Sequence, residues 1–258
     1  MKAFHMITAL FAGLAVLLLV LPLPEALRLP LLILLLTLYV LLLVYGASRI
    51  DSQLFLHALC KGDSGSKSVA LSFDDGPNGD RSMEILELLS EHDCPSTFFL
   101  TGSRAEVQTD LVKEMLKRGH LIGNHSYSHS NFFPLFRSSR IRKELEDTNC
   151  ILKDAGAGTV RFFRPPFGVS NPNVARGVKA SGMEVAGWSI RSFDTRNEAA
   201  GKVVQRILKR MGGGDVILLH ETSDNILEIL ELLLPAIREA GLSCVTMDQL
   251  LGEGSNGA

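Results

Sequence analysis

Hydrophobic residues run almost unbroken through the start of the chain, in two blocks at about residues 3–23 and 29–45. A short segment with Pro22, Pro24 and Pro30 separates the blocks. Each block has about 17 to 21 residues, near the lower limit for a bilayer-spanning helix, and neither has a polar stripe. The pattern predicts a two-helix membrane anchor over residues 1–48. A buried pair of soluble helices is an alternative, as is a cleaved signal peptide for the first block, although no A-x-A-like site follows it.

Between about residues 48 and 67 the chain turns polar and includes Gly-Asp-Ser-Gly-Ser at 62–66. This composition is typical of a flexible joint. We therefore predict a linker at 49–66 and a folded domain at 67–251. The glycine-rich end, 252–258, is predicted to be a disordered tail.

Within the domain, short apolar runs alternate with segments whose apolar residues recur every three or four positions. The runs are typical of buried strands and the periodic segments of amphipathic helices. Strands are predicted at 69–73, 97–101, 121–123, 160–163, 184–188, 215–219 and 244–246. Helices are predicted at 82–92, 105–118, 141–155, 173–180, 199–211 and 225–240. The alternation indicates an α/β domain with a parallel sheet, either open or closed into a seven-unit barrel.

The composition adds two constraints. The 258-residue chain has a formal net charge of −2, which gives no electrostatic argument for a nucleic-acid partner. Its cysteines, Cys60, Cys94, Cys150 and Cys244, lack C-x-x-C spacing. We therefore expect small buried or half-buried apolar residues rather than a disulfide framework or a zinc knuckle, and the cysteines do not indicate a redox compartment.

The first predicted strand ends in two carboxylates, Asp74 and Asp75, before a Gly-Pro turn. In α/β proteins the carboxyl ends of the strands are where chemistry takes place. Adjacent carboxylates repel one another unless a cation binds one of them, and the other can then stay ionised as a base. The pair therefore predicts a cation site.

Two histidines, His125 and His129, directly follow the third predicted strand. If the segment is helical, their spacing places both imidazoles on one face, which is a common way to hold a divalent metal ion. They are expected at the same end of the sheet as Asp75. One carboxylate and two imidazoles, with positions open for water, form the donor set of a catalytic metal ion.

Two further polar groups follow strands. Arg164 precedes two prolines, which fix the backbone and present both the guanidinium and the Phe167 amide rigidly. An arginine near Asp74 would lower the pKa of that carboxyl and keep it ionised. His220 ends the run Val-Ile-Leu-Leu-His, where it is a candidate general acid. The alternatives without a catalytic role are an ordinary Pro-rich turn with a solvated Arg164, and a His220 that is packed or capped.

These motifs resemble those of the polysaccharide deacetylase family, also called carbohydrate esterase family 4 or the NodB-homology domain. The resemblance covers about residues 67–251 and rests on Ser-Phe-Asp-Asp-Gly-Pro, His-Ser-Tyr-Ser-His, Arg-Pro-Pro-Phe-Gly and Leu-Leu-His, in the family's order and spacing. It implies a distorted (β/α)7-type barrel and hydrolysis of N-acetyl groups, sometimes O-acetyl groups, on a glycan. It also implies one divalent metal ion, usually Zn2+, with Co2+ or Ni2+ as alternatives.

The resemblance also implies a role for each residue. The metal ligands would be Asp75, His125 and His129. Asp74 would be the base that activates a water molecule, held in place by Arg164, and His220 would protonate the departing sugar amine. The Phe167 N–H would stabilise the carbonyl oxygen, and Trp188 and Leu218 would wall the acetyl pocket.

The chain departs from the family pattern at two positions. Phe167 stands where many members have Tyr, which leaves the backbone donor intact. Family members often have an acid three residues after Trp188, where this chain has Arg191. That acid orients the catalytic histidine. Our hypothesis is that Asp194 takes over this role toward His220.

The sequence therefore predicts a membrane-anchored, metal-dependent N-deacetylase of peptidoglycan, a chitin-like polymer or a lipid-linked sugar. An O-acetyl esterase, a non-carbohydrate amidase, a non-catalytic glycan-binding module and a membrane scaffold without a metal are alternatives. No protein partner is indicated. Lys2 and Arg49 on the domain side against Arg28 in the hairpin loop weakly favour a cytoplasmic domain. An envelope glycan as substrate favours the extracytoplasmic side, which we predict.

Overall fold

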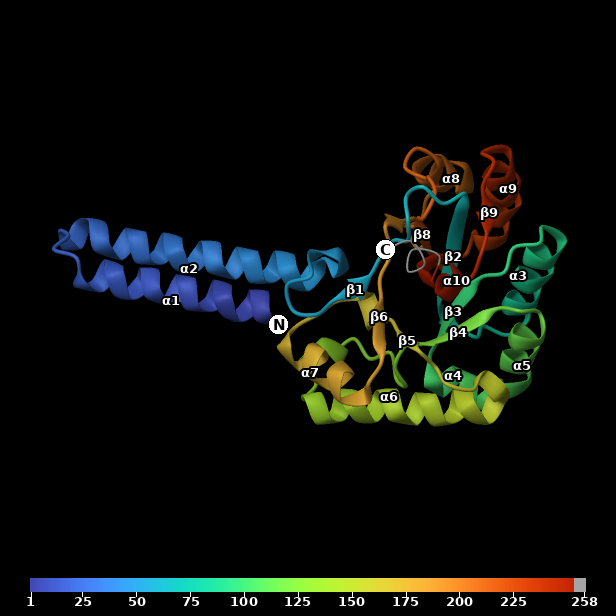
Figure 1. Ribbon diagram of the computed structural model, residues 1–258, viewed down its shortest axis with the longest axis horizontal. Coiled ribbons are helices and arrows are strands. Elements are labelled where there is room, and N and C mark those ends of the chain that lie inside the picture. Colours follow the sequence, from blue (N-terminus) through green and yellow to red (C-terminus); the bar gives the residue numbers. More distant parts are fainter. Residues whose placement is uncertain (253–258) are drawn as a thin grey trace.

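The N-terminal helices, α1 (Lys2–Val20) and α2 (Glu25–Ser48), form an antiparallel arm that extends from the rest of the molecule (Figure 1). The computed structural model describes residues 1–252. With 19 and 24 residues, the helices are about 28 and 36 Å long, comparable to the roughly 30 Å hydrocarbon core of a bilayer. Their most apolar segments bury nothing against the barrel. Both predicted helices are confirmed, and by length and composition each could cross a membrane.

The domain is built on a sheet with the strand order β1-β6-β5-β4-β3-β2-β8-β7, and β9 pairs with β2 outside this path. The strands are β1 (Ala58–Leu59), β2 (Ser68–Gly76), β3 (Thr97–Leu100), β4 (Leu121–Asn124), β5 (Phe162–Phe163), β6 (Glu184–Ala186), β7 (Ile190–Arg191), β8 (Val216–His220) and β9 (Ser243–Cys244). Every pair of these strands that hydrogen-bonds is parallel. The predicted distorted barrel is confirmed. The structure adds β1 and β7, which are too short to give a sequence pattern.

Helices cover the outside of this barrel (Figure 1). They are α3 (Asp80–Glu91), α4 (Gly102–Val107), α5 (Thr109–Lys117), α6 (Ser138–Leu152), α7 (Pro172–Ser181), α8 (Ala200–Leu208) and α9 (Ile226–Glu239). The helix predicted at 105–118 is interrupted at Gln108. The side-chain amide of Gln108 donates to the Pro77 carbonyl at 3.1 Å and accepts from the Gly79 N–H at 2.8 Å. The interruption therefore supports the turn that follows Asp75.

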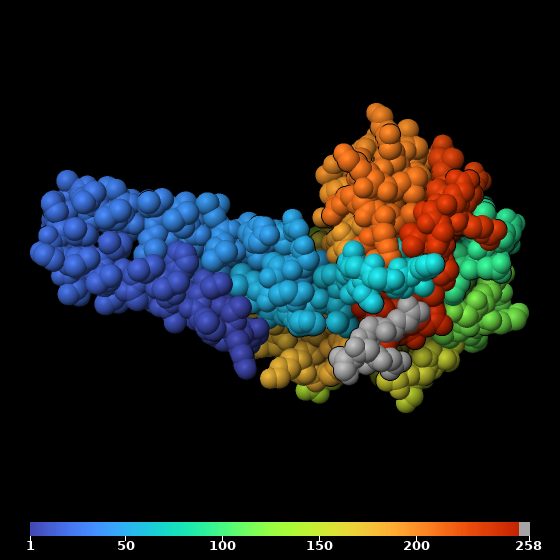
Figure 2. All heavy atoms as spheres, turned by 45° about the horizontal axis from the view of Figure 1, so that its top comes forward, coloured from blue at the N-terminus to red at the C-terminus, as the bar shows by residue number. Residues whose placement is uncertain are grey.

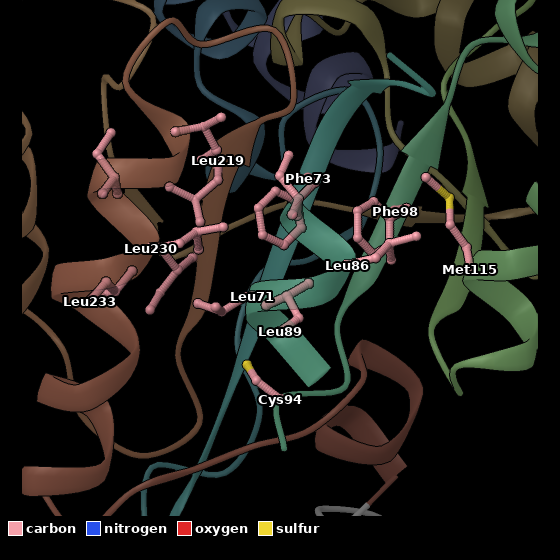
Figure 3. Close-up of a cluster of buried hydrophobic side chains, with 14 of the residues drawn as sticks. Leu71, Phe73, Leu86, Leu89, Cys94, Phe98, Met115, Leu219, Leu230 and Leu233 are labelled. Atoms are coloured by element: carbon pink, nitrogen blue, oxygen red, sulfur yellow. The ribbon is translucent and has the colours of Figure 1, made fainter. Parts of the chain in front are cut away.

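The two faces of β2 show how the strand positions the site. Leu71 and Phe73 point outward into the main core, where they pack with leucines of α3 and α9 (Figure 3). Burial of each such side chain contributes about 1.5–3 kcal/mol. Because side chains alternate along a strand, Ala70, Ser72 and Asp74 face the barrel interior. The small side chains of Ala70 and Ser72 leave space inside the barrel below Asp74.

The C-terminal helix α10 (Met247–Gly252) fills the barrel at the amino ends of the strands. Met247 and Leu250 pack there against Ala70 and Phe99. The Met247 N–H donates to the hydroxyl of Thr97, the first residue of β3, at 2.9 Å. Only the carboxyl ends therefore remain available for a site. Of the predicted disordered tail, Gly252 is helical and 253–258 lie outside the described residues.

The segment predicted as a linker, 49–66, is part of the fold. Ile50 and Phe55 are each only 3% exposed, and β1 pairs with β6. Gly62, in the predicted flexible joint, donates its N–H to the Gly214 carbonyl at 2.8 Å. Figure 2 shows these light-blue residues filling the junction between the arm and the barrel. The apolar residues in this polar stretch are irregularly spaced, so their pattern does not predict a folded segment.

The expectation that the cysteines are unpaired is wrong for two of them. Cys94, after α3, forms a disulfide with Cys244 of β9, and their Cα atoms lie 4.9 Å apart. The two residues are separated by 150 positions, so no local spacing could reveal the pair. Cys60 and Cys150 are free, and Cys150 is exposed.

Candidate metal-dependent active site

Four strands deliver polar side chains to one edge of the barrel. Asp74 lies near the end of β2, His125 follows β4, Arg164 follows β5, and His220 ends β8. Across β2 and β8, Asp74 is in register with His220. The structure therefore brings together, at the carboxyl ends of the strands, the motifs that the sequence places far apart.

Asp75, His125 and His129 form a cluster in which one ligand atom of each residue lies within 4.8 Å of the others. The Nε2 atoms of His129 and His125 are 3.1 and 3.5 Å from Asp75 Oδ1. A carboxylate and two imidazoles form a donor set that suits a divalent ion and leaves positions open for water and substrate. The three residues therefore fit the metal ion that the resemblance implies.

The backbone of this cluster is unusual. Asp75, Ser126 and His129 have φ angles of 70°, 65° and 45°. This left-handed region costs non-glycine residues on the order of 1–3 kcal/mol and is common at functional sites. The histidine segment is a loop rather than the helix considered above. Its imidazoles converge because Ser126 Oγ accepts the His129 N–H at 3.2 Å.

His125 is oriented by a hydrogen bond on the side away from the cluster. Its Nδ1 lies 2.8 Å from the carbonyl oxygen of Arg164. Because a carbonyl can only accept, Nδ1 carries the proton, and the Nε2 lone pair faces Asp75. This tautomer is the one that a metal ligand requires.

Asp75 is also fixed from several directions. Arg104 Nη1 donates to its backbone carbonyl at 2.9 Å, and the Thr222 hydroxyl donates to Oδ2 at 3.3 Å. Burial alone would raise the pKa of Asp75, but contact with His125 and the charges of His129 and His220 hold it below its usual range. Asp75 is therefore a carboxylate at neutral pH.

Arg164 is completely buried and fully paired. Its Nη1 donates to Asp74 Oδ1 at 2.8 Å and to Ser72 Oγ at 2.9 Å, and Nη2 donates to the Gly187 carbonyl at 2.8 Å. Its Cζ atom lies 4.0 Å from the centroid of the Phe99 ring. Burial lowers the pKa of Arg164, and the charge of Asp74 opposes this effect. Asp74, which is only 4% exposed, therefore has a charged hydrogen-bond donor as its partner.

His220 is hydrogen-bonded to Asp194. His220 Nδ1 lies 2.8 Å from Asp194 Oδ1, and the His220 N–H donates to Asp194 Oδ2 at 2.7 Å. Ser192 Oγ donates to the same carboxylate at 2.7 Å. Burial lowers the pKa of His220, but the hydrogen bond and charge of Asp194 outweigh it and raise the pKa. Arg191, in contrast, is exposed.

The predicted pocket residues lie around this edge. Phe167 has a φ angle of 61° and is 45% exposed. Trp188 packs so closely over Gly168 that there is no space for a Cβ atom. Leu218 is 2% exposed and lies on the face of β8 that also carries His220.

Glu221, which follows His220, is a residue of this edge that the sequence motifs do not indicate. Glu221 is fully buried. Its Oε2 accepts from the Ser82 hydroxyl, and its carboxyl group occupies the space beside Gly76 where a Cβ would lie. Among the described residues, Oε1 has no hydrogen-bond partner. Burial raises the pKa of Glu221 to about 8, so the group is largely uncharged at neutral pH. A charged residue directly after a buried strand was the available signal.

The chain is similar in sequence to known proteins. A sequence profile of polysaccharide deacetylases matches residues 61–186. A peptidoglycan-N-acetylglucosamine deacetylase of Bacillus cereus is 32% identical over 193 residues, which are 72% of this chain and 88% of that protein. A chitooligosaccharide deacetylase of Sinorhizobium fredii is 28% identical over 208 residues, which are 76% of this chain and 97% of that protein.

Solved structures give the same result. A peptidoglycan N-acetylglucosamine deacetylase superposes with a TM-score of 0.70 at 30% identity, covering 75% of this chain and 92% of that one. A family 4 pseudoenzyme from Bacillus anthracis also gives 0.70, at 27% identity, covering 76% of this chain and 69% of that one. Because both its sequence and its fold match these proteins, the chain belongs to the polysaccharide deacetylase family of carbon–nitrogen hydrolases.

Proposed function

We propose that this chain is a membrane-anchored, metal-dependent enzyme that removes N-acetyl groups from a glycan containing N-acetylhexosamine. The observation that carries the proposal is a set of three metal-ligand side chains beside two separately oriented acid–base groups, all at one barrel edge. The ligands are Asp75, His125 and His129, and the acid–base groups are Asp74 and His220.

Asp74 is the proposed base, which would accept a proton from the attacking water. Its Oδ1 is bound by Arg164, whereas Oδ2 lies 3.8 Å from His125 Nε2 and so faces the ligand cluster. A divalent ion at the three ligands, most simply Zn2+, would supply a Lewis acid that lowers the pKa of water and polarises the acetyl carbonyl. Arg164 would hold Asp74 in position.

His220 is the proposed acid, which would donate a proton to the departing sugar amine. Asp194 holds the Nδ1 proton, so Nε2 of the protonated imidazole is the donor. The Phe167 N–H is the proposed donor to the carbonyl oxygen as negative charge grows there, and loss of one such donor typically costs about 3–4 kcal/mol. Trp188 and Leu218 would enclose the acetyl group.

We place the domain on the outer side of the membrane. The disulfide between Cys94 and Cys244 supports this side, because such bonds persist in oxidising compartments. The count of basic residues, Lys2 and Arg49 on the domain side against Arg28 in the hairpin loop, favours the cytoplasm by one charge and is a weaker argument. The test is a fusion of the C-terminus to a reporter that functions only in the cytoplasm. Reporter activity would contradict the outer location.

The test of the proposed function is acetate release from an N-acetylglucosamine oligomer by the full chain in detergent. The full chain is needed because β1 belongs to the barrel. Release is expected with added zinc or cobalt, and loss is expected with a chelator or in Asp74→Asn. The matched control is Asp110→Asn on α5, which loses an exposed carboxylate paired with Lys113 and should retain activity.

Parallel assays separate this proposal from the alternatives. Faster release from O-acetylated substrates would favour an esterase. A metal-loaded chain that releases acetate from no substrate would resemble the pseudoenzyme of the same fold and would contradict the deacetylase assignment. A chain that binds no metal would contradict the site itself.

A further inference from the structure

A small basic pocket lies where the membrane arm joins the barrel. It has a volume of about 230 Å³, and its lining includes Ser48, Arg49, Asp51, Trp188, Arg191 and Arg210. Pockets for drug-sized ligands usually measure about 300–1,000 Å³. This pocket is therefore of a size for a small charged group rather than for a glycan chain.

The net charge of the pocket is positive, because three arginines and one aspartate line it. Arg49 pairs with Asp51, its Nε and Nη2 lying 2.9 and 2.7 Å from the two carboxylate oxygens. Among the described residues, Arg191 and Arg210 form no ion pair. Arg191 lies over the ring of Trp188, with its Cζ atom 5.9 Å from the centroid, and Arg210 Nη2 donates to the Ser189 carbonyl at 3.4 Å. Guanidinium groups bind phosphate oxygens through pairs of N–H donors.

The pocket also lies at the depth of lipid headgroups. The 24 residues of α2 span about 36 Å, whereas the hydrocarbon core is about 30 Å thick. The last turn of α2 therefore reaches the headgroup layer. Tyr45 and Arg49 stack there at 5.8 Å, and both residue types are common at membrane interfaces. Ser48 ends α2 and lines the pocket.

Two contacts connect this pocket with the active site. The Ser170 N–H donates to the carbonyl of Ala47 in α2 at 3.0 Å, so the loop that carries Phe167 is bonded to the membrane helix. Trp188, which lines the pocket, also packs over Gly168, the residue after Phe167. A ligand held in the pocket would therefore lie next to the acetyl-binding residues.

From these observations we infer that the pocket binds the phosphate group of a membrane lipid. The source of the phosphate is either a lipid-linked acetylated sugar, which it would position for deacetylation, or an anionic phospholipid of the bilayer. The first source rests on the proposed function. The second requires only that the arm lies in a membrane.

Trp188 is the only tryptophan in the sequence, so its fluorescence reports on the pocket without requiring catalysis. The full chain in phosphatidylcholine nanodiscs would be titrated with farnesyl phosphate. Loss of a charge-assisted hydrogen bond corresponds to about a tenfold change, so Arg191→Gln and Arg210→Gln should each raise the dissociation constant about tenfold. The matched control is Arg142→Gln, an exposed arginine of α6 paired with Glu146. Dissociation constants within twofold of the control would overturn the site.

Two further assays identify the source. If the phosphate belongs to the substrate, Arg191→Gln should raise the KM for farnesyl-phosphate-linked N-acetylglucosamine about tenfold more than the KM for the phosphate-free oligomer. If it belongs to the bilayer, phosphatidylglycerol should compete with farnesyl phosphate, and the two KM values should change alike, which would overturn the substrate assignment. Farnesyl phosphate binding without acetate release from either sugar would contradict the proposed function and leave the phosphate site standing.

Discussion

Arg164 and Arg191 both lie against the ring of Trp188, with their Cζ atoms 5.6 and 5.9 Å from its centroid, yet they have opposite environments. Arg164 is fully buried and donates to a carboxylate, a hydroxyl and backbone carbonyls. Arg191 is exposed and has no carboxylate partner among the described residues. A buried charge is tolerated only when its donors are satisfied. Arg164 therefore belongs to the framework of the site, whereas the exposed Arg191 is one of the groups that we propose for binding a phosphate.

The largest effect is expected from Arg164→Gln. The change leaves the buried Asp74 carboxylate without its partner, which typically lowers the free energy of unfolding by about 3–5 kcal/mol. Acetate release should also be lost. Thermal unfolding followed by circular dichroism would measure the first effect, with Arg142→Gln expected within about 0.5 kcal/mol of the wild type.

A second variant sharpens this result. Adding Asp74→Asn to Arg164→Gln removes both charges, so stability should partly return although activity does not. If the double variant were as unstable as Arg164→Gln, packing rather than charge would explain the loss, and our account of the pair would be wrong.

The next effect is expected from Asp194→Asn. General acid catalysis contributes about 10²–10⁴-fold, so a misoriented His220 should lower the rate at least about a hundredfold. Asp194 raises the pKa of His220, and the acid works only when protonated. Activity should therefore fall as pH rises through that pKa, and the variant should lose activity at lower pH than the wild type.

The matched control for this variant is Glu198→Gln, which loses a carboxylate on the same loop that binds Arg206. It should retain both the rate and the pH profile. An unchanged pH profile in Asp194→Asn would show that His220 is oriented by another group.

A smaller effect is expected from Glu221→Gln, which tests a buried carboxyl group whose Oε1 has no hydrogen-bond partner among the described residues. The pKa of Glu221 is about 8 in the folded protein and ordinarily 4.5. A raised pKa stabilises the fold fully below pH 4.5, and this contribution is lost as pH rises through about 8. The free energy of unfolding of Glu221→Gln, taken relative to that of the wild type, should therefore rise by at least about 1 kcal/mol between pH 5 and pH 9. If the difference in free energy of unfolding between the variant and the wild type stayed constant across this range, Glu221 would be charged in the folded protein.

The smallest effect on stability is expected from Arg191→Gln. An exposed arginine without an ion pair contributes little, so the free energy of unfolding should change by less than about 0.5 kcal/mol. The binding of farnesyl phosphate described above should nevertheless weaken. A large loss of stability would show that Arg191 is a structural residue, contrary to the comparison with Arg164.

The sequence by itself determined the elements with a clear period and the motifs at their ends. Apolar runs such as 69–73 and 215–219 formed β2 and β8, because alternate apolar residues pack on a sheet whatever their partners. The α/β class followed from the alternation of these runs with helical segments. The sequence also predicted that the polar residues of the four motifs lie at one edge, since strand ends of a parallel sheet share an edge.

Only the tertiary structure decided which distant groups meet. The partners Arg164 and Asp74, His220 and Asp194, and Cys94 and Cys244 are brought together by long-range packing. The ligand histidines converge through a left-handed loop rather than a helix. The polar segment after α2 joins the barrel through β1. Such contacts depend on how elements pack in space, which local periodicity does not encode, and the basic pocket at the membrane junction arises in the same way.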